Sequence, residues 1–245
     1  MVSLTRSLPL TSGMPVESPM LRSARVMALL RHGDYLQPEN VPSAHLPWAL
    51  TAEGERQAAE AAQQIRVWAD RHGLLIASRI VTSRQLRAWQ TGRIIADCLA
   101  ITEIEENPAL AERSVGSVAN LTVEEISAVA SQDPRIGELP DNWKSDSYYR
   151  LPFQGAESLM EAGQRVATAL KEAMQGINPG ELQIVVGHGA SIRHAMTYLD
   201  LLKPHEVAGL SMYHCQPVWL SQSADGQWSH IDGAWKVRRS EAFRD

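Results

Sequence analysis

The sequence predicts an α/β protein, a three-layer α/β/α sandwich with a mostly parallel central sheet. Short apolar runs without alternation occur at 26–30, 80–81 and 182–186, as in strands buried on both faces. Segments with helical periodicity separate these runs, and such alternation is typical of a parallel sheet covered by helices. We see no linker, and expect one domain over 25–236 between a flexible leader at 1–24 and a solvated tail at 237–245.

The composition narrows the class of protein. The chain has 245 residues, of which 44% are hydrophobic and 21% charged, as in ordinary globular proteins. A net charge of −5 attracts neither nucleic acid nor an anionic membrane over long range, so any anion site must be local. No apolar stretch is long enough to span a membrane, and none has the form of a secretory signal. Cys98 and Cys215 form no disulfide or metal pattern, which favours a reducing cytoplasm.

The first apolar run ends in Arg31, His32 and Gly33. Parallel sheets bind ligands just beyond the carboxyl ends of their strands, where these residues would lie. Taken alone, the pattern leaves open an ordinary loop histidine beside a solvated arginine. The segment 33–50 contains three prolines and no periodicity, so we expect a loop next to this position.

Periodicity and capping residues predict the helices. Thr51 is the expected N-cap of a helix that runs to about 71 and ends before Gly73. The expected helices after it are 86–99, a helix from the Thr122/Glu125 capping box to before Pro134, a helix from the Ser158/Glu161 capping box, and 190–202.

The remaining elements are shorter. A strand is expected at 101–104, and a hairpin is expected from strands at 217–220 and 227–231 around Asp225-Gly226. Between them, 114–154 is polar and aromatic without a clear period, and we interpret it as an insertion or lid over the sheet edge.

Polar side chains follow three of the predicted strands. They are Arg31 and His32 after the first, Ser83 with Arg87 one turn later after the second, and His188 after the third. Arginine forks and imidazoles are groups that bind phosphate oxygens. Gly33 and Gly189 allow close approach of the backbone, and the helix from about 190 would direct free N–H groups to the same region. Together these residues predict a phosphate site.

The motifs resemble, in order, those of the histidine phosphatase superfamily, also called the phosphoglycerate mutase-like family. The matching segments, spread over about 26–220, are Leu30-Arg31-His32-Gly33, Leu50-Thr51-Ala52-Glu53-Gly54, the T-S-x-x-x-R-A-x-x-T segment at 82–91, Gly155-Ala156-Glu157-Ser158 and the second-histidine motif at 186–193. Alanine replaces the second glycine of the family's G-G-E-S turn.

The resemblance implies a mechanism and a set of roles. A neutral nitrogen of His32 would attack phosphorus, and water would then release phosphate from the phosphohistidine. Arg31, Arg87 and a protonated His188 would neutralise the phosphoryl oxygens, so no metal or other cofactor is expected. By position in the family pattern, Glu112 is the general acid, which needs burial or a neighbouring dianion to keep a proton near neutral pH.

Further candidates have two interpretations each. Arg113, Trp143, Tyr148 and Arg150 would line a substrate pocket or cover a satellite core; the expected substrate-binding set is Gly33, Ser83, Arg113, Arg150 and Gly189. His194, His214 and His230 are expected to be structural or solvent-facing, and Cys215 a small buried hydrophobe.

Departures from the mutase pattern favour a phosphatase. Cofactor-dependent mutases of the family carry an asparagine where this chain has Pro38 and a tyrosine where it has Val115. They also carry basic residues in the insertion, whereas 114–134 contains no lysine or arginine. A mutase is therefore the second hypothesis, and a non-catalytic phosphate-binding scaffold the third. The expected substrate is a small phosphomonoester, with a phosphoprotein as the alternative.

Overall fold

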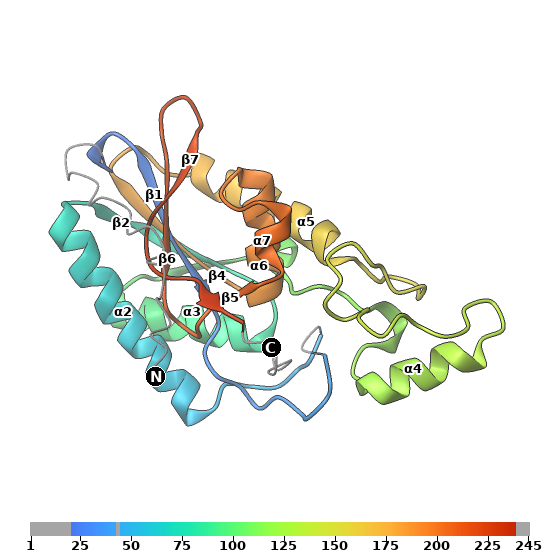
Figure 1. Cartoon of the computed structure of the whole chain (residues 1–245). Coiled ribbons are helices and arrows are strands. Elements are labelled where there is room, and N and C mark those ends of the chain that lie inside the picture. The colour runs from blue at the N-terminus through green and yellow to red at the C-terminus, as the bar shows by residue number, and fades with distance from the viewer. Residues whose placement is uncertain (1–20, 43–44, 239–245) are drawn as a thin grey trace, which may run out of the picture.

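The computed structural model describes residues 21–42 and 45–238. Its centre is a six-stranded sheet with the order β3-β2-β4-β1-β6-β7. Strands β3, β2, β4 and β1 are mutually parallel, and β6 pairs antiparallel with both β1 and β7. Helices cover both faces (Figure 1), so the predicted three-layer sandwich is confirmed. The strands of this sheet are β1 (Arg25–Arg31), β2 (Leu75–Thr82), β3 (Glu103–Glu106), β4 (Glu181–Gly187), β6 (Val218–Gln222) and β7 (Trp228–Asp232).

The β1 strand shows why the apolar runs do not alternate. Val26, Ala28 and Leu30 face the layer of α2 (Ala52–His72) and α3 (Leu86–Leu99). Met27 and Leu29 face the opposite layer, which contains α5 (Leu159–Gln175) and α6 (Gly189–Ala195). Because both faces are covered, every position of the strand interior favours an apolar side chain.

The predicted helix caps are confirmed. Thr51 Oγ1 accepts a hydrogen bond from Gly54 N, and α2 ends at Gly73 in the left-handed conformation, with φ 64°. Both capping boxes form, Thr122 with Glu125 before α4 (Val123–Gln132) and Ser158 with Glu161 before α5. The remaining short elements are η1 (Pro108–Leu110), η2 (Gly116–Val118), η3 (Met196–Leu199), α7 (Pro204–Val207), β5 (Leu210–Ser211) and β8 (Lys236–Val237).

Two element predictions were wrong in extent. The helix expected over 190–202 is α helix only to Ala195, and it tightens into η3 before Asp200 turns the chain at φ 58°. The strand expected at 101–104 begins at 103, because Ala100 takes the left-handed cap of α3 and Ile101 N donates to Ala96 O. The chain cannot enter a strand until this cap is complete.

Two described segments lie outside the 25–236 range that we expect for the domain. Leu21, which we assigned to the leader, is buried in the core cluster that contains α2. At the other end, β8 pairs antiparallel with β5 and includes Val237. The rest of the expected leader and tail, 1–20 and 239–245, lies outside the described residues.

The insertion has a core of its own. Its buried members are Val115, Val118, Ile126, Trp143, Leu151 and Ala156. Figure 1 shows α4 at the far end of this insertion, projecting away from the sheet rather than over its edge. Val123 N donates to Asn40 O, which joins the insertion to the loop after β1. Within the described ranges, no helix is both long enough and apolar enough to cross a membrane.

Candidate active site

Three neighbouring strands bring the predicted phosphate ligands together. In the order β2-β4-β1, the carboxyl ends carry Ser83, His188 and His32. The ladder extends into the site, since His32 N donates to Gly187 O and Ser83 N to Val186 O. The ring centroids of His32 and His188 are 5.1 Å apart. The structure therefore unites residues that are more than 150 positions apart in the sequence.

The hydrogen bonds of His32 define its tautomer. Nδ1 lies 2.8 Å from Gly33 O, which can only accept, and Arg87 Nε donates to Nε2 over 3.1 Å. The proton is therefore on Nδ1, and Nε2 carries the lone pair. Burial, followed by the charges of Arg87, His188 and Arg31, holds the pKa of His32 well below its usual value. The ring is therefore a neutral imidazole whose Nε2 lone pair accepts the hydrogen bond from Arg87.

Arg87 is completely buried and held by several groups. Its Nη1 donates to Leu46 O over 2.9 Å and its Nη2 to Gln85 Oε1 over 3.0 Å. The guanidinium carbon lies 4.6 Å from the ring centroid of Tyr35, whose edge meets His32 at 5.1 Å between centroids. Tyr35 thus packs against both the expected nucleophile and its arginine, a role that the sequence did not indicate.

Arg31 approaches the site from the other side of the β1 end. Its Nη1 donates to Met212 O over 3.2 Å, and its carbonyl accepts from Cys215 N. A Cβ atom added to Gly189 would lie 3.1 Å from Arg31 Cδ, so the backbone after His188 packs directly on this side chain. The close approach that Gly189 permits is thus to the Arg31 side chain.

His188 is buried, and only one of its ring nitrogens has a hydrogen-bond partner among the described residues. Its Nε2 is hydrogen-bonded to Ser83 Oγ at 2.9 Å, while its buried Nδ1 has no hydrogen-bond partner among the described residues. Burial, Arg87 and Arg31 hold the pKa of His188 well below its usual value. Burial and the positive charge of the two arginines thus both favour the neutral imidazole.

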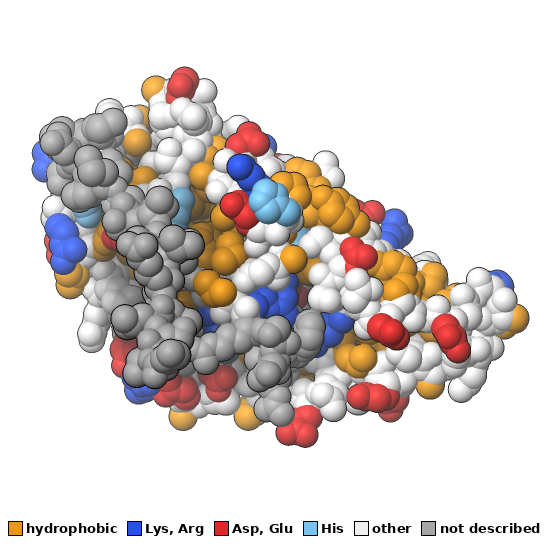
Figure 2. All heavy atoms as spheres, in the orientation of Figure 1, with side chains coloured by type: hydrophobic (Ala, Val, Ile, Leu, Met, Phe, Trp, Pro, Cys, Tyr) orange, Lys and Arg blue, Asp and Glu red, His pale blue; other side chains and the backbone are white. Residues whose placement is uncertain are grey.

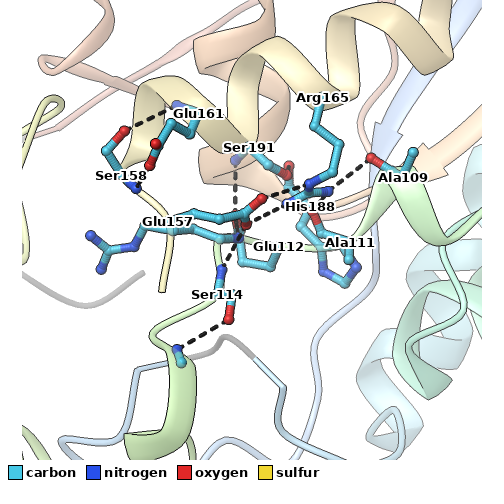
Figure 3. Close-up of polar contacts among 12 residues, drawn as sticks. Ala109, Ala111, Glu112, Ser114, Glu157, Ser158, Glu161, Arg165, His188 and Ser191 are labelled. Carbon is cyan, nitrogen blue, oxygen red and sulfur yellow. Dashed lines mark hydrogen bonds and ion pairs between the residues drawn. The ribbon is translucent and has the colours of Figure 1, made fainter. Parts of the chain in front are cut away.

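Glu112 lies beside the helix that follows His188 (Figure 3). Its Oε1 accepts from Ser191 N and Arg113 N, both over 2.9 Å, and its Oε2 accepts from Ala190 N over 3.1 Å. The carboxyl group is buried, as predicted. It also occupies the N–H groups of α6 that we expected to face the phosphate, so the anion site depends on side chains and not on this helix end.

Two motifs meet in a close contact of backbones beneath the site. A Cβ on Gly33 would lie 2.5 Å from Gly54 O, and one on Gly54 would lie 2.0 Å from Asp34 O. Thr51 Oγ1 donates to Asp34 Oδ2 over 2.7 Å, and Gly33 N donates to Thr91 Oγ1 over 3.0 Å. The segment after β1 is thus held against the N-terminus of α2 and against Thr91 within α3.

The other predicted binding residues separate into two groups. Arg113 is buried, with its guanidinium carbon 5.8 Å from the Trp143 ring centroid, at the border between site and insertion. Arg150 is exposed and pairs with Glu161 at 3.3 Å, which gives no support to a role in substrate binding. Tyr148 is 66% exposed and covers neither a pocket nor the satellite core.

Of the three histidines that we assigned to structural or exposed positions, His214 lies at the site. Its ring centroid is 5.7 Å from that of His32, and burial with the Arg31 charge lowers its pKa to about 3. No local signal could have found it, because its position depends on the pairing of its backbone beside Arg31.

His194 is structural as predicted, with hydrogen bonds to Ala190 O and Ser147 Oγ. Cys215 is buried as predicted, and burial raises its pKa to about 12.

A cavity of about 670 Å³ lies between the loop after β1 and the insertion. Tyr35 lines it and also touches His32, so the cavity adjoins the phosphate site. The charged lining residues are Asp34, Glu39, Glu124, Asp141 and Lys144. Figure 2 shows acidic side chains gathered over the α4 end of the molecule, with basic ones nearer the middle of this face. The cavity is therefore mainly acidic, next to a basic phosphate site.

Comparison with known proteins agrees with this geometry. The family model described as "Histidine phosphatase superfamily (branch 1)" matches residues 27–231. A 2,3-bisphosphoglycerate-dependent phosphoglycerate mutase of Parvibaculum lavamentivorans is 30% identical over 200 residues, covering 79% of this chain and 88% of that protein.

Two solved structures share the fold. YhfR of Bacillus stearothermophilus superposes with a TM-score of 0.68 at 21% identity, covering 86% of this chain and 98% of that one. A mycobacterial glucosyl-3-phosphoglycerate phosphatase superposes with a TM-score of 0.62 at 23% identity, covering 87% and 98%.

Proposed function

Since the chain belongs to the histidine phosphatase superfamily, we propose that it is a phosphomonoester hydrolase with a phosphohistidine intermediate on His32. The observation that carries the proposal is the tautomer of His32, whose Nε2 lone pair lies beside the Arg87 guanidinium. Nε2 attacks phosphorus, and the P–O bond to the leaving alcohol breaks. Water then attacks phosphorus, the P–N bond breaks, and inorganic phosphate leaves.

The charges around His32 suit a phosphoryl group that has two negative charges. Arg31 and Arg87 supply positive charge in a buried site, where it acts more strongly than in water. An arriving dianion would raise the pKa of His188 and favour its protonated form. The unpartnered Nδ1 of His188 would then donate to a phosphoryl oxygen. This set of groups neutralises the phosphoryl oxygens without a metal ion.

Glu112 is proposed to exchange the proton with the leaving group and with water. Of its two oxygens, Oε2 accepts a single backbone hydrogen bond, at 3.1 Å, whereas Oε1 accepts two. Oε2 is therefore the oxygen with fewer backbone hydrogen bonds, and we assign the proton transfer to it. In this scheme Oε2 protonates the departing alkoxide, and the resulting carboxylate takes a proton from the attacking water.

The cavity next to Tyr35 supports a leaving alcohol without a second anionic group. Four carboxylates and one lysine line it, and an anionic group there would meet repulsion. This argument favours a small phosphomonoester whose alcohol is neutral or cationic. A phosphoprotein remains the alternative source of the same phosphoryl group, and hydrolysis of a phosphopeptide in preference to small esters would favour it.

A phosphoglycerate mutase is the second candidate, because the relative at 30% identity bears that name. Two positions argue against it. Val115 is buried in the satellite core, and Pro38 lines the acidic cavity; neither supplies a polar group for the carboxylate of phosphoglycerate.

One assay distinguishes the candidates. The native chain is incubated with p-nitrophenyl phosphate in the presence of a chelator, beside His32→Ala and the exposed-histidine control His230→Ala. We expect phosphate release by the native chain and the control but not by His32→Ala. Interconversion of phosphoglycerates primed by a bisphosphate, without net release, would favour the mutase. Activity that persists in His32→Ala would refute the mechanism, and neither reaction would favour a non-catalytic scaffold.

A further inference from the structure

We infer that Glu157 and Arg165 are positioning residues that hold Glu112 where it can protonate the leaving group. The inference rests on the proposed function, because it takes Glu112 as the general acid. Figure 3 shows these two side chains next to the segment that carries Glu112. The family resemblance of 155–158 assigned no task to Glu157, and Arg165 was not singled out by the sequence.

Arg165 holds the chain before Glu112. From α5 its Nη1 donates to Ala109 O over 2.9 Å and to Ala111 O over 3.1 Å. Its Nε and Nη2 donate to the two oxygens of Glu157 over 2.8 and 2.6 Å. The Arg165 guanidinium therefore binds the Glu157 carboxylate with two of its nitrogens and two carbonyls of the segment before Glu112 with the third. Lysine cannot reproduce this geometry, because its ammonium is a compact donor without a planar fork.

Glu157 holds the chain after Glu112. Its Oε2 accepts from Ser114 N over 3.1 Å, and its own backbone N donates to Ser114 O over 2.8 Å. Burial favours the protonated form of Glu157, but Arg165 and the Ser114 amide outweigh it and hold its pKa below the usual value. The side chain is therefore an ionised acceptor at the pH of catalysis.

The two residues thus fix positions 109, 111 and 114 on either side of Glu112. The side chains of the pair are 26% and 23% exposed, so solvent screens it less than a surface ion pair. General-acid catalysis requires the donor within hydrogen-bond reach of the leaving oxygen. A displacement of the segment would remove Glu112 from that position while leaving His32, which follows β1, in place.

A matched control lies on α3. Arg93 pairs with Asp97 at 2.6 Å, with side chains 48% and 56% exposed. Its described contacts do not include the 109–114 segment. Arg93→Gln therefore removes an arginine–carboxylate ion pair from a helix without releasing Glu112.

The test uses two substrates that differ in their need for an acid. An alkyl phosphate requires a proton on its leaving alkoxide, whereas p-nitrophenolate leaves without one. For Glu157→Gln and Arg165→Gln we expect kcat/KM on the alkyl ester to fall roughly 10- to 100-fold, with p-nitrophenyl phosphate changed by less than about 3-fold. Glu112→Gln should show the same selectivity, and Glu112→Gln with Glu157→Gln together should lose little more than Glu112→Gln. Arg93→Gln should leave kcat/KM unchanged on both substrates.

Several outcomes would overturn the inference. Equal losses on both substrates would indicate general damage to the fold, and additive losses in the double variant would show that Glu157 does not act through Glu112. Arg165→Lys serves as a second variant if Arg165→Gln fails to fold. It should restore folding but keep the selective loss on the alkyl ester, and full activity in it would count against the forked contact. A native chain that hydrolyses neither substrate would instead refute the proposed function itself.

Discussion

Acid should destabilise this protein through histidines that the fold keeps neutral. Burial, with Arg31, lowers the pKa of His214 from 6.5 to about 3. Between these values the unfolded chain binds a proton at His214 that the folded chain does not bind. The stability that the neutral His214 contributes to the folded state is therefore fully present above pH 6.5 and is lost as the pH falls toward 3. Linkage gives a loss of about 2 kcal/mol between pH 7 and pH 5 from His214 alone. His32 and His188, whose pKa values are also lowered, act in the same direction.

Urea denaturation at pH 7, 6 and 5 measures this loss as a decline in the free energy of unfolding. In His214→Asn the decline should be smaller by about 2 kcal/mol over the same interval. His230→Asn removes an exposed histidine and should leave the decline unchanged. An equal decline in the native chain and His214→Asn would refute the reasoning, because it would show that the folded state protonates His214 as readily as the unfolded state does.

Three further predictions concern the site and its support. Arg87→Lys should reduce kcat/KM on p-nitrophenyl phosphate by about 10²- to 10³-fold, because an ammonium cannot replace the oriented guanidinium next to His32; a loss below 10-fold would contradict this. Gly54→Ala puts a Cβ 2.0 Å from a backbone carbonyl oxygen and should lower the free energy of unfolding by roughly 2 kcal/mol or more. Gly209→Ala, whose Cβ would meet its nearest atom at 3.6 Å, is the matched control. Combining Glu124→Gln with Asp141→Asn should raise kcat/KM for an ester whose alcohol carries a carboxylate, with little change for p-nitrophenyl phosphate; no change for either ester would mean that the cavity does not receive the leaving group.

The predictions of local structure succeeded where residues within a short segment determine its conformation. Thr51 and Gly73 delimit α2 because a hydroxyl caps its first turn and a left-handed residue ends it. The prediction failed at 190–202, where the chain leaves the α-helical path after Ala195 and turns at Asp200. Nothing in its periodicity marks that point, and the end of the helix is determined by packing with the rest of the protein.

The sequence predicted which residues form the site, but not the contacts or the protonation states of those residues. The strand ends of a parallel sheet meet at one edge, so Arg31, His32 and His188 could be grouped before any coordinates. Their protonation could not, because it depends on burial and on distances between charges. At His188, for example, burial and the nearby arginines favour the neutral form.

By itself, the sequence determined the layered fold, the caps of its main helices and the ordered phosphate motifs, because periodicity and capping act over a few residues. Only the tertiary structure decided the tautomer of His32, the position of His214 beside His32 and the acidic lining of the cavity. It also decided the hydrogen bonds by which Arg165 holds the segment that carries Glu112. Each of these depends on groups brought together from distant parts of the chain. Their burial determines how strongly charges and hydrogen bonds act between them, and burial is a property of the folded molecule.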